Sequence, residues 1–290
     1  MIDYFIHIAI LINIYLILGQ SLNLSFGVGK LFNLAHIASY SIGAYTSALL
    51  SVNYEFNFLS CLLLSGVFAS MFSFLIGLIS LKLDSDYFAV GTIAFAAVVT
   101  SLLINWKSLT NGVLGISGID RPEVGKIDFY SDLNFLILSS IVSIISLTIL
   151  YLFFKSSFGR DLKASSEYEL AAKSLAKNIL LLRNCTFIVS SFFAGIAGSL
   201  FAFYINYIDP SSFMLNEMIF VITIVIVGKP GSFLGCVLAC VFLVILPEPL
   251  RFVDLPSSLI GPGRQILYAL ILFLVVYYKK DKLFPHTRKV

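Results

Sequence analysis

Residues 134–154 read NFLILSSIVSIISLTILYLFF, a stretch without a charged side chain. A transmembrane helix needs about 20 mostly apolar residues to cross roughly 30 Å of hydrocarbon, and this stretch meets that requirement. Similar apolar stretches lie on both sides of it, near residues 4–18, 35–52, 58–81, 87–106, 184–207, 217–228, 232–247 and 263–279. Their lengths and spacing predict an all-α integral membrane protein, a polytopic helical bundle of about 8–9 transmembrane segments.

The composition of the whole chain excludes an ordinary soluble protein. Of its 290 residues, 59% are hydrophobic and 12% are charged, whereas a soluble domain has about 45–50% apolar and about 25% charged residues. The basic residues are scattered over loops, so nucleic acid is not an expected partner. The four cysteines have no CxxC spacing and are expected to be structural thiols. Residues 3–18 are expected to form the first span rather than a cleaved signal.

The distribution of Lys and Arg predicts which loops face the cytoplasm. Short cytoplasmic loops retain positive charge, and two segments are rich in it, a loop at about 155–183 and the C-terminal tail. The basic residues concerned are Lys155, Arg160, Lys163, Lys173, Lys177 and Arg183 in the loop, and Lys279, Lys280, Lys282, Arg288 and Lys289 in the tail. Counting spans back from the loop places the N-terminus and an outer loop at about 107–133 outside, and the C-terminus in the cytoplasm. This topology requires that residues 217–247 cross the membrane an even number of times.

Two glycine-containing segments interrupt the apolar pattern where a continuous helix would be expected. They are Gly19–Ala35 (GQSLNLSFGVGKLFNLA) and Val227–Gly235 (VGKPGSFLG). Irregular backbone inside a membrane persists only where protein or a water-filled cavity satisfies its polar groups, and paired interruptions often flank a solute path. Broken or re-entrant helices are one interpretation, and ordinary cytoplasmic turns are the other. In either case residues 1–290 form a single transmembrane domain.

Catalytic and metal-binding chemistry have little support in the sequence. The three histidines are His7, His36 and His286. Only His36 lies near a potential cavity, and it lacks a Cys, Ser or carboxylate at interpretable spacing, so a hydrogen-bonded membrane histidine is expected. Because the spans contain no metal-ligand cluster and no pair of carboxylates, an embedded enzyme is not expected.

Ion coupling and nucleotide binding also fit this chain poorly. An ion-coupled carrier needs ionisable side chains inside the membrane, but the acidic residues nearest to the spans lie at their ends: Glu55, Asp84, Asp86, Glu217 and Glu248. A phosphate-binding loop reads GxxxxGK[ST]. Around Gly29-Lys30, Leu24 replaces the first glycine and Leu31 replaces the Ser or Thr. Any nucleotide must therefore bind a different subunit.

The loop before the 184–207 span is a candidate docking segment. Residues 157–178 read SFGRDLKASSEYELAAKSLAKN, with helix formers in the middle and charges on the flanks. Ala171 and Ala172 are small enough to give a partner close access. A short amphipathic helix that docks on another protein is one interpretation, and a solvated loop whose charges only set the topology is the other.

Several short blocks stand in a characteristic order along the chain. They are 19–24 (GQSLNL) with His36 and 43–46 (GAYT), 86–89 (DYFA) with Thr92, Ala94 and Phe95, 109–112 (LTNG) with 115–119 (GISGI), 158–160 (FGR) with 169–172 (ELAA), 193–198 (FAGIAG), Asp209-Pro210, Gly231-Ser232, Pro247-Glu248 and 263–265 (GRQ). In this order and spacing they resemble the branched-chain amino acid permease family of ATP-driven ABC importers, and in particular the larger of its two paired permease subunits. Each block alone is weakly specific, but together they cover nearly the whole chain.

The resemblance implies a permease subunit of the bacterial inner membrane that performs no covalent chemistry. The implied partners are a sister permease in a heterodimer, two cytoplasmic ATPases, an external substrate-binding protein and membrane lipid. The chain itself would carry no cofactor or metal, and ATP-Mg would bind the ATPases. The implied substrates are leucine, isoleucine and valine or related small solutes. Alternatives are a urea or short-amide permease of the same family, an ion-coupled secondary transporter and a passive channel.

The resemblance also implies site residues. Those expected to couple to the ATPases are Gly159, Arg160, Glu169, Ala171 and Ala172, and those expected along the substrate path are Asn23, His36, Tyr45, Thr92 and Asn105. The chain departs from the family where Ala96-Ala97 replaces a usual Gly-Glu pair, and where Ser166 and Ala176 replace a usual Arg and Gly. The first departure concerns the substrate, and the other two concern the ATPase surface.

Overall fold

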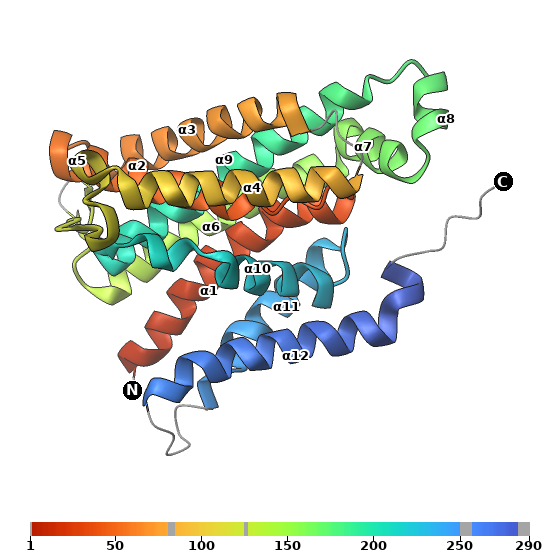
Figure 1. The fold of residues 1–290 in the computed structure, drawn as a ribbon. Coiled ribbons are helices and arrows are strands. Elements are labelled where there is room, and N and C mark those ends of the chain that lie inside the picture. The colour runs from red at the N-terminus through yellow and green to blue at the C-terminus, as the bar shows by residue number, and fades with distance from the viewer. Residues whose placement is uncertain (1, 81–84, 125–126, 250–256, 284–290) are drawn as a thin grey trace.

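The computed structural model describes residues 2–80, 85–124, 127–249 and 257–283, and most of them are helical (Figure 1). The long apolar helices are α1 (Ile2–Leu22), α2 (His36–Tyr54), α3 (Phe58–Ser80), α4 (Ser85–Asn105), α6 (Asp132–Lys155), α9 (Ile179–Ile205), α10 (Leu215–Val227), α11 (Phe233–Ile245) and α12 (Ser257–Leu283). The shorter elements are the π-helix η1 (Asn23–Val28), α5 (Lys107–Thr110), α7 (Ser157–Glu167), α8 (Glu169–Ser174), the 3-10 helices η2 (Gly112–Leu114) and η3 (Pro210–Phe213), and strands β1 (Ile116–Ser117), β2 (Glu123–Val124), β3 (Ile127–Asp128) and β4 (Tyr207–Ile208).

The predicted class, an all-α polytopic membrane protein, is confirmed. Within the described ranges, seven helical segments are long and apolar enough to cross a membrane. They are 2–28, 58–78, 87–105, 132–155, 179–205, 210–227 and 261–278. The more polar α2 and the shorter α11 are not among them, but both coincide with predicted segments.

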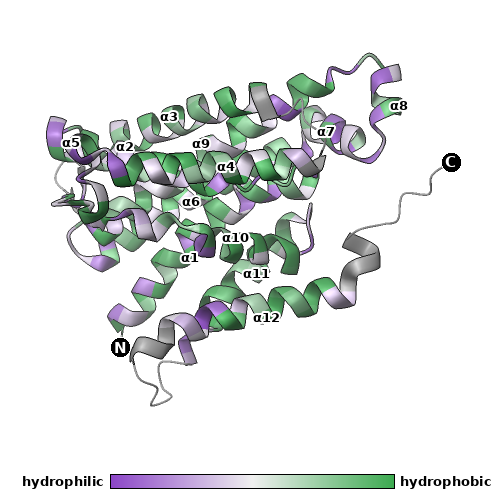
Figure 2. Cartoon of the chain, in the orientation of Figure 1, coloured by the Kyte–Doolittle hydropathy of each residue, from purple (hydrophilic) through white to green (hydrophobic). Residues whose placement is uncertain are grey.

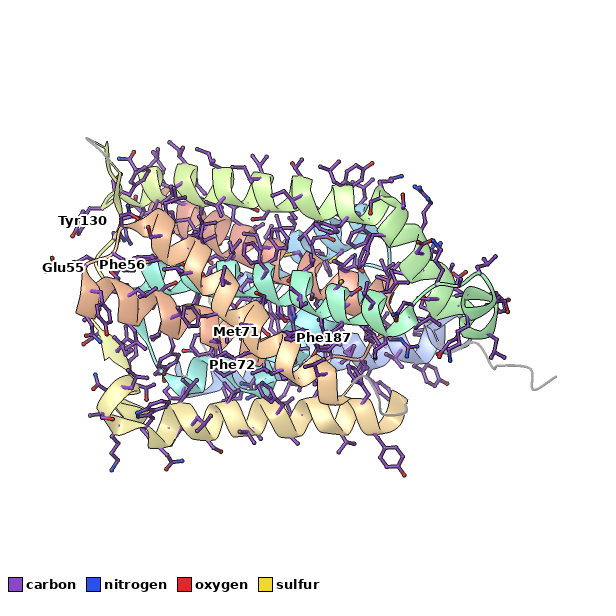
Figure 3. All side chains as sticks on the ribbon, turned by 90° about the horizontal axis from the view of Figure 1, so that it is seen from above. Glu55, Phe56, Met71, Phe72, Tyr130 and Phe187 are labelled. Carbon is purple, nitrogen blue, oxygen red and sulfur yellow. The ribbon has the colours of Figure 1, made fainter. Side chains whose placement is uncertain are left out.

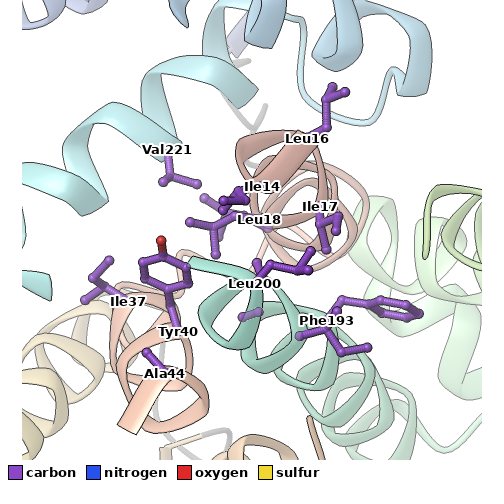
Figure 4. Packing of buried hydrophobic residues seen from close by; sticks show 14 of the residues in the cluster. Ile14, Leu16, Ile17, Leu18, Ile37, Tyr40, Ala44, Phe193, Leu200 and Val221 are labelled. Carbon is purple, nitrogen blue, oxygen red and sulfur yellow. The ribbon is translucent and has the colours of Figure 1, made fainter. Parts of the chain in front are cut away.

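Helix α9 is the centre of the bundle. It contacts α1, α2 and α3, and 72% of its apolar window is buried inside the protein. Leu200 and Phe193 of α9 pack with Ile17 of α1 and Tyr40 of α2 in one continuous core (Figure 4). The outer faces of α3, α4 and α6 expose large apolar side chains instead, as expected of helices whose solvent is lipid.

Small residues let α2 and α9 approach backbone to backbone. A Cβ atom added to Gly43 would lie 2.3 Å from Cα of Gly195, and one added to Gly198 would lie 2.1 Å from the carbonyl oxygen of Tyr40. Helices in lipid gain no hydrophobic free energy by meeting, so close van der Waals packing between small residues stabilises the contact. The GxxG spacing of Gly195 and Gly198 thus serves the central helix crossing.

Helices α10 and α11 form a hairpin of two short helices, and the segment 210–227 is long enough to cross a membrane only because it joins α10 to η3. Each has 13 residues, which corresponds to about 20 Å against roughly 30 Å of hydrocarbon. They run in opposite directions around the turn Gly228–Ser232, which contains Lys229 and Gly231 at φ of 68° and 80° (Figure 1). The short helices fit the re-entrant interpretation of this break, and the even number of crossings by residues 217–247 stays a prediction.

The interruption of the first span begins after Leu22 and not, as the sequence analysis expected, at Gly19. Helix α1 continues through Gly19 to Leu22, and the chain then follows the π-helix η1 to Val28. Gly19 serves packing, because a Cβ added there would lie 3.2 Å from Cγ2 of Ile224. The irregular backbone is therefore confined to η1 and to the loop from Gly29 to Ala35.

The polar elements gather at the two ends of the bundle. Figure 2 shows hydrophilic residues around α5 at one end and around α7 and α8 at the other. Glu55 and Phe56 of the α2–α3 turn and Tyr130 lie at the end of the bundle that carries α5 (Figure 3). Helix α12 starts near the N-terminus and runs toward the end that carries α7 and α8 (Figure 1). The predicted tail charges Arg288 and Lys289, and also Asp84, lie outside the described residues.

We expect Gly195→Val to destabilise the protein, because the added side chain meets the carbonyl oxygen of Ser65 at 2.5 Å and Cβ of Ala69 at 2.8 Å. Overpacking of this kind costs about 1–3 kcal/mol or more. The measurement is the apparent melting temperature of the detergent-purified protein. Gly263→Ala is the matched control, since nothing lies within 4 Å of its added Cβ. Equal melting temperatures for the wild type and Gly195→Val would contradict the close packing of α9 against Ser65 and Ala69 of α3.

Candidate functional site

The two irregular segments lie against each other, and Asn23 joins them. Its Oδ1 accepts a hydrogen bond from the backbone N–H of Gly231 at 2.8 Å, and its Nδ2 donates to the carbonyl of Ser232 at 3.1 Å. Asn23 is fully buried at the first position of η1. Because both amide atoms meet backbone groups of the turn, one side chain satisfies polar groups that lipid could not.

Gln20 and two glycines complete this junction. Gln20 Nε2 donates to the carbonyl of Phe233 at 2.6 Å, one residue beyond the contact of Asn23. A Cβ added to Gly27 would lie 2.4 Å from the backbone nitrogen of Gly231, so the π-helix and the turn approach as closely as backbones can. A π-helix is rare and often marks a functional position.

His36 secures the opposite side of the same segment. Its Nε2 lies 3.0 Å from Oγ of Ser21 and 3.3 Å from the carbonyl of Leu18, and its Nδ1 lies 3.4 Å from Oγ of Ser190. Ser190 also donates to the carbonyl of Ser21 at 2.7 Å. All these side chains are buried, so the prediction of a hydrogen-bonded membrane histidine is confirmed.

Thr92 holds the loop that follows the π-helix. Thr92 lies on α4, and its Oγ1 accepts a hydrogen bond from the backbone N–H of Leu34 at 3.2 Å. Within the loop, the N–H of Leu31 donates to the carbonyl of Ser25 at 3.0 Å. Thr92 is therefore a support of irregular backbone in this structure, as Asn23 is.

The remaining two path candidates lie elsewhere. Tyr45 is buried on α2, with its ring 6.1 Å from that of Phe213. Asn105 lies at the end of α4 and, with Ala97, lines a shallow groove of about 340 Å³ along that helix. The structure thus gathers Asn23, His36 and Thr92 around one irregular segment and leaves Tyr45 and Asn105 apart from it.

The candidate docking segment folds into α7 and α8, and α7 contacts the π-helix directly. Ser166 Oγ donates to the carbonyl of Val28, the last residue of η1, at 2.9 Å. Leu162 is fully buried, and its Cδ1 would lie 3.5 Å from a Cβ on Gly29. Ser166 is one of the departures from the family pattern, and here it forms a contact between the segment and the first break.

Three of the expected coupling residues maintain the shape of the segment. A Cβ on Gly159 would lie 2.4 Å from the carbonyl oxygen of Phe153, so this position admits only glycine at the α6–α7 corner. Arg160 donates to the carbonyl of Lys155 at 2.9 Å. Glu169 pairs with Lys173 at 2.8 Å and with Arg183 at 2.9 Å, and the hydrogen bond from Lys173 is the main reason that its pKa is lowered.

The two alanines differ in exposure. Ala172 is buried against the chain itself at 4% exposure, so the expectation that it admits a partner does not fit this structure, whereas Ala171 is exposed. Around Ala171 lie three exposed apolar side chains, Tyr168 at 75%, Leu170 at 80% and Leu175 at 73%. These four residues are called the α8 patch below. The sequence could have predicted which of the two alanines is buried only if the bounds of this six-residue helix had been known.

A charged cluster between α1, α10 and α12 was missed by the sequence analysis. Tyr15 Oη donates to Glu217 at 2.5 Å, Tyr4 donates to Glu248, and Arg264 Nη2 lies 3.6 Å from Oε1 of Glu248. Glu217 and Glu248 are at helix ends in the sequence, which conceals that they converge. The described residues contain no group of three or more His, Cys, Asp or Glu side chains that could hold a metal ion.

Broken helices that meet inside a bundle, together with ionisable side chains between spans, are features of membrane transport proteins. This is the class that the fold and the site define.

The comparisons with known proteins identify the family. Residues 4–277 match the family model described as branched-chain amino acid transport system / permease component. The chain is 32% identical to the high-affinity branched-chain amino acid transport system permease protein LivM of Escherichia coli K12 and to that of Salmonella typhimurium LT2, over 98% of this chain and 70% of each relative. It is 29% identical to a probable branched-chain amino acid transport permease protein LivM of Methanocaldococcus jannaschii, over 77% of this chain and 68% of the relative. No solved structure matches the chain. The chain therefore belongs to the branched-chain amino acid transport permease family, and it is a transport component rather than an enzyme.

We expect Asn23→Leu to lower the stability of the protein by about 1–3 kcal/mol, since a buried donor and acceptor of the Gly228–Ser232 turn lose their partner. The measurement is the melting temperature in detergent. Asn105→Leu is the matched control, because the Asn105 amide donates to the carbonyl of Ser101 in its own helix and is exposed. A shift no larger for Asn23→Leu than for Asn105→Leu would contradict the bridging role of Asn23.

Proposed function

We propose that this chain is the permease subunit of an ATP-driven importer that moves leucine, isoleucine and valine across a bacterial inner membrane. Its N-terminus would lie outside and its C-terminus in the cytoplasm. It would pair with a sister permease, receive substrate from an external binding protein, and be driven by two cytoplasmic ATPases that bind ATP-Mg. Family membership and the printed names of the relatives support the substrate class.

The α8 patch is the observation that carries the proposal of ATPase docking. Large apolar side chains gathered on a polar loop mark a protein interaction site. The patch belongs to a helix that the ion pair of Glu169 with Arg183 joins to α9. An apolar surface that is already held in place suits a docking role, because a partner can bind it without the entropic cost of ordering it.

The docking segment has a continuous mechanical connection to both breaks. Helix α7 packs against α8 and α9, and Ser166 links it to the end of η1. Asn23, at the start of η1, links the same π-helix to the turn between α10 and α11. We propose that ATPase closure displaces 157–178, and that this movement reaches the two breaks together and changes the side to which the path opens.

The proposed path residues divide into two roles. Asn23, His36 and Thr92 keep the irregular backbone of the first break in place while it moves. Tyr45 and Asn105 lie toward the α5 end, and Asn105 faces the groove on α4 that includes Ala97. In this proposal they act where the path opens outward.

The assembly is tested by purifying the tagged chain from its native membrane in mild detergent and identifying its companions by mass spectrometry. Recovery of a second permease and two ATPases, with leucine uptake that needs ATP, is the expected result. Recovery of the chain alone, with uptake driven by an ion gradient, would overturn the proposal and favour an ion-coupled carrier. Uptake of urea or a short amide without leucine would correct the substrate only.

We expect Leu170→Arg to remove the ATPases from the purified complex, because a charge in place of the most exposed apolar side chain of the α8 patch would be buried unpaired on docking. The loss should be at least ten-fold in the ATPase-to-permease ratio. Leu114→Arg is the matched control, since Leu114 is 81% exposed and Leu170 is 80% exposed, at opposite ends of the bundle. Membrane levels of both variants should equal those of the wild type. Normal ATPase recovery with Leu170→Arg would exclude the α8 patch as the docking surface.

A further inference from the structure

A small cleft is lined by residues of α1, α10, α11 and α12. Helix α12 begins at the end of the bundle opposite α7 and α8 (Figure 1). Its volume is about 220 Å³, and its walls include Leu11, Glu217, Phe220, Val244, Glu248 and Arg264. Pockets for drug-sized ligands occupy about 300–1,000 Å³. The cleft is therefore of a size for a smaller solute.

Arg264 brings a positive charge with unused hydrogen-bond donors into the cleft. Its Nε and Nη2 are buried and have no hydrogen-bond partner in the described part of the chain. The 3.6 Å between Nη2 and Glu248 is an ion-pair distance that is too long for a hydrogen bond. A guanidinium offers a planar fork of N–H donors that matches a carboxylate, so these free donors are suited to one.

Glu217 brings a negative charge to the same cleft. Its Oε1 accepts a hydrogen bond from Tyr15 at 2.5 Å, and the side chain stands on the first turn of α10. Ionisable side chains within membrane-spanning segments are costly, and they commonly mark a solute pathway. Here opposite charges line one small cleft, and the apolar side chains of Leu11, Phe220 and Val244 complete its wall.

We propose that this cleft binds a zwitterionic aliphatic amino acid, with its α-carboxylate on Arg264, its α-ammonium on Glu217 and its side chain against Leu11, Phe220 and Val244. The inference rests on the proposed function and gives it a substrate contact site. An uncharged solute such as urea would offer no carboxylate to the unbonded Nε and Nη2 donors of Arg264 and no ammonium group to Glu217. The chemistry of the cleft therefore favours an amino acid over the short-amide alternative.

The test uses the complete transporter complex with a reporter cysteine, Asn216→Cys, which stands in the wall of the cleft. We expect L-leucine to slow the reaction of this thiol with a methanethiosulfonate reagent at least five-fold. Leucinol lacks the carboxylate and 4-methylpentanoate lacks the ammonium, so both should protect weakly. The complex without Asn216→Cys gives the background from the native thiols, of which Cys61, Cys236 and Cys240 are buried and Cys185 is partly exposed.

Arg264→Gln in the reporter complex should abolish protection and lower leucine uptake more than ten-fold, with unchanged ATPase recovery. Arg264→Lys should keep part of both, because it keeps the charge. Arg121→Gln is the matched control, an arginine at the same end that pairs with Asp132 at 2.6 Å outside the cleft, and it should keep both.

The outcomes separate the two proposals. Leucine uptake by the wild type without protection, or full uptake by Arg264→Gln, would overturn the cleft while the proposed function stands. If the wild type imports no branched-chain amino acid, the proposed function fails. In that case, protection by another zwitterionic amino acid that is lost in Arg264→Gln still supports the cleft, and its absence overturns the cleft as well.

Discussion

The two hydrogen bonds of Asn23 are the interaction on which the interior of this permease depends. Hydrocarbon supplies no donors or acceptors, so a turn such as Gly228–Ser232 is stable among spans only if protein groups satisfy it. Asn23 does so from the opposite half of the chain, and the absent side chain of Gly27 leaves room for the contact. The two breaks consequently form a single structural unit, and neither could keep its present backbone path if the other were removed.

The sequence predicted the helices well because hydropathy acts directly on each of them. The segments predicted at 58–81 and 134–154 correspond to the helices Phe58–Ser80 and Asp132–Lys155. The prediction failed where a residue's environment depends on distant partners. Gly19 was taken for a helix break, but it is a packing contact with Ile224. Ala172 was expected to meet a partner and is buried, because a six-residue helix has too little periodicity to orient it.

For the polar residues too, the sequence predicted the local environment but not the distant partners. His36 was correctly expected to be hydrogen-bonded, since a buried imidazole in a bundle must find partners, yet the sequence did not indicate that Ser21 and Ser190 would be those partners. Arg264 and Glu217 are separated by 47 positions in the chain and meet only because α12 returns alongside α10. The positions of charged residues in the sequence indicate where spans end. Which charged residues lie close together depends on the fold.

The π-helix at Asn23–Val28 has a consequence for the register of the first span. A π-turn holds one more residue than an α-turn, so it behaves as a one-residue insertion that the helix has absorbed. If the six residues of η1 rewound as α-helix, everything after them would rotate by about 100° and the chain would advance by about 1.5 Å. The carbonyl of Val28 would then turn away from Ser166, while Asn23, at the start of the turn, would remain in place. A variant that deletes one residue within η1 would instead continue as an α-helix without this rotation, because the deletion removes the residue that the π-turn absorbs, and both the junction between the breaks and the contact with α7 would be kept.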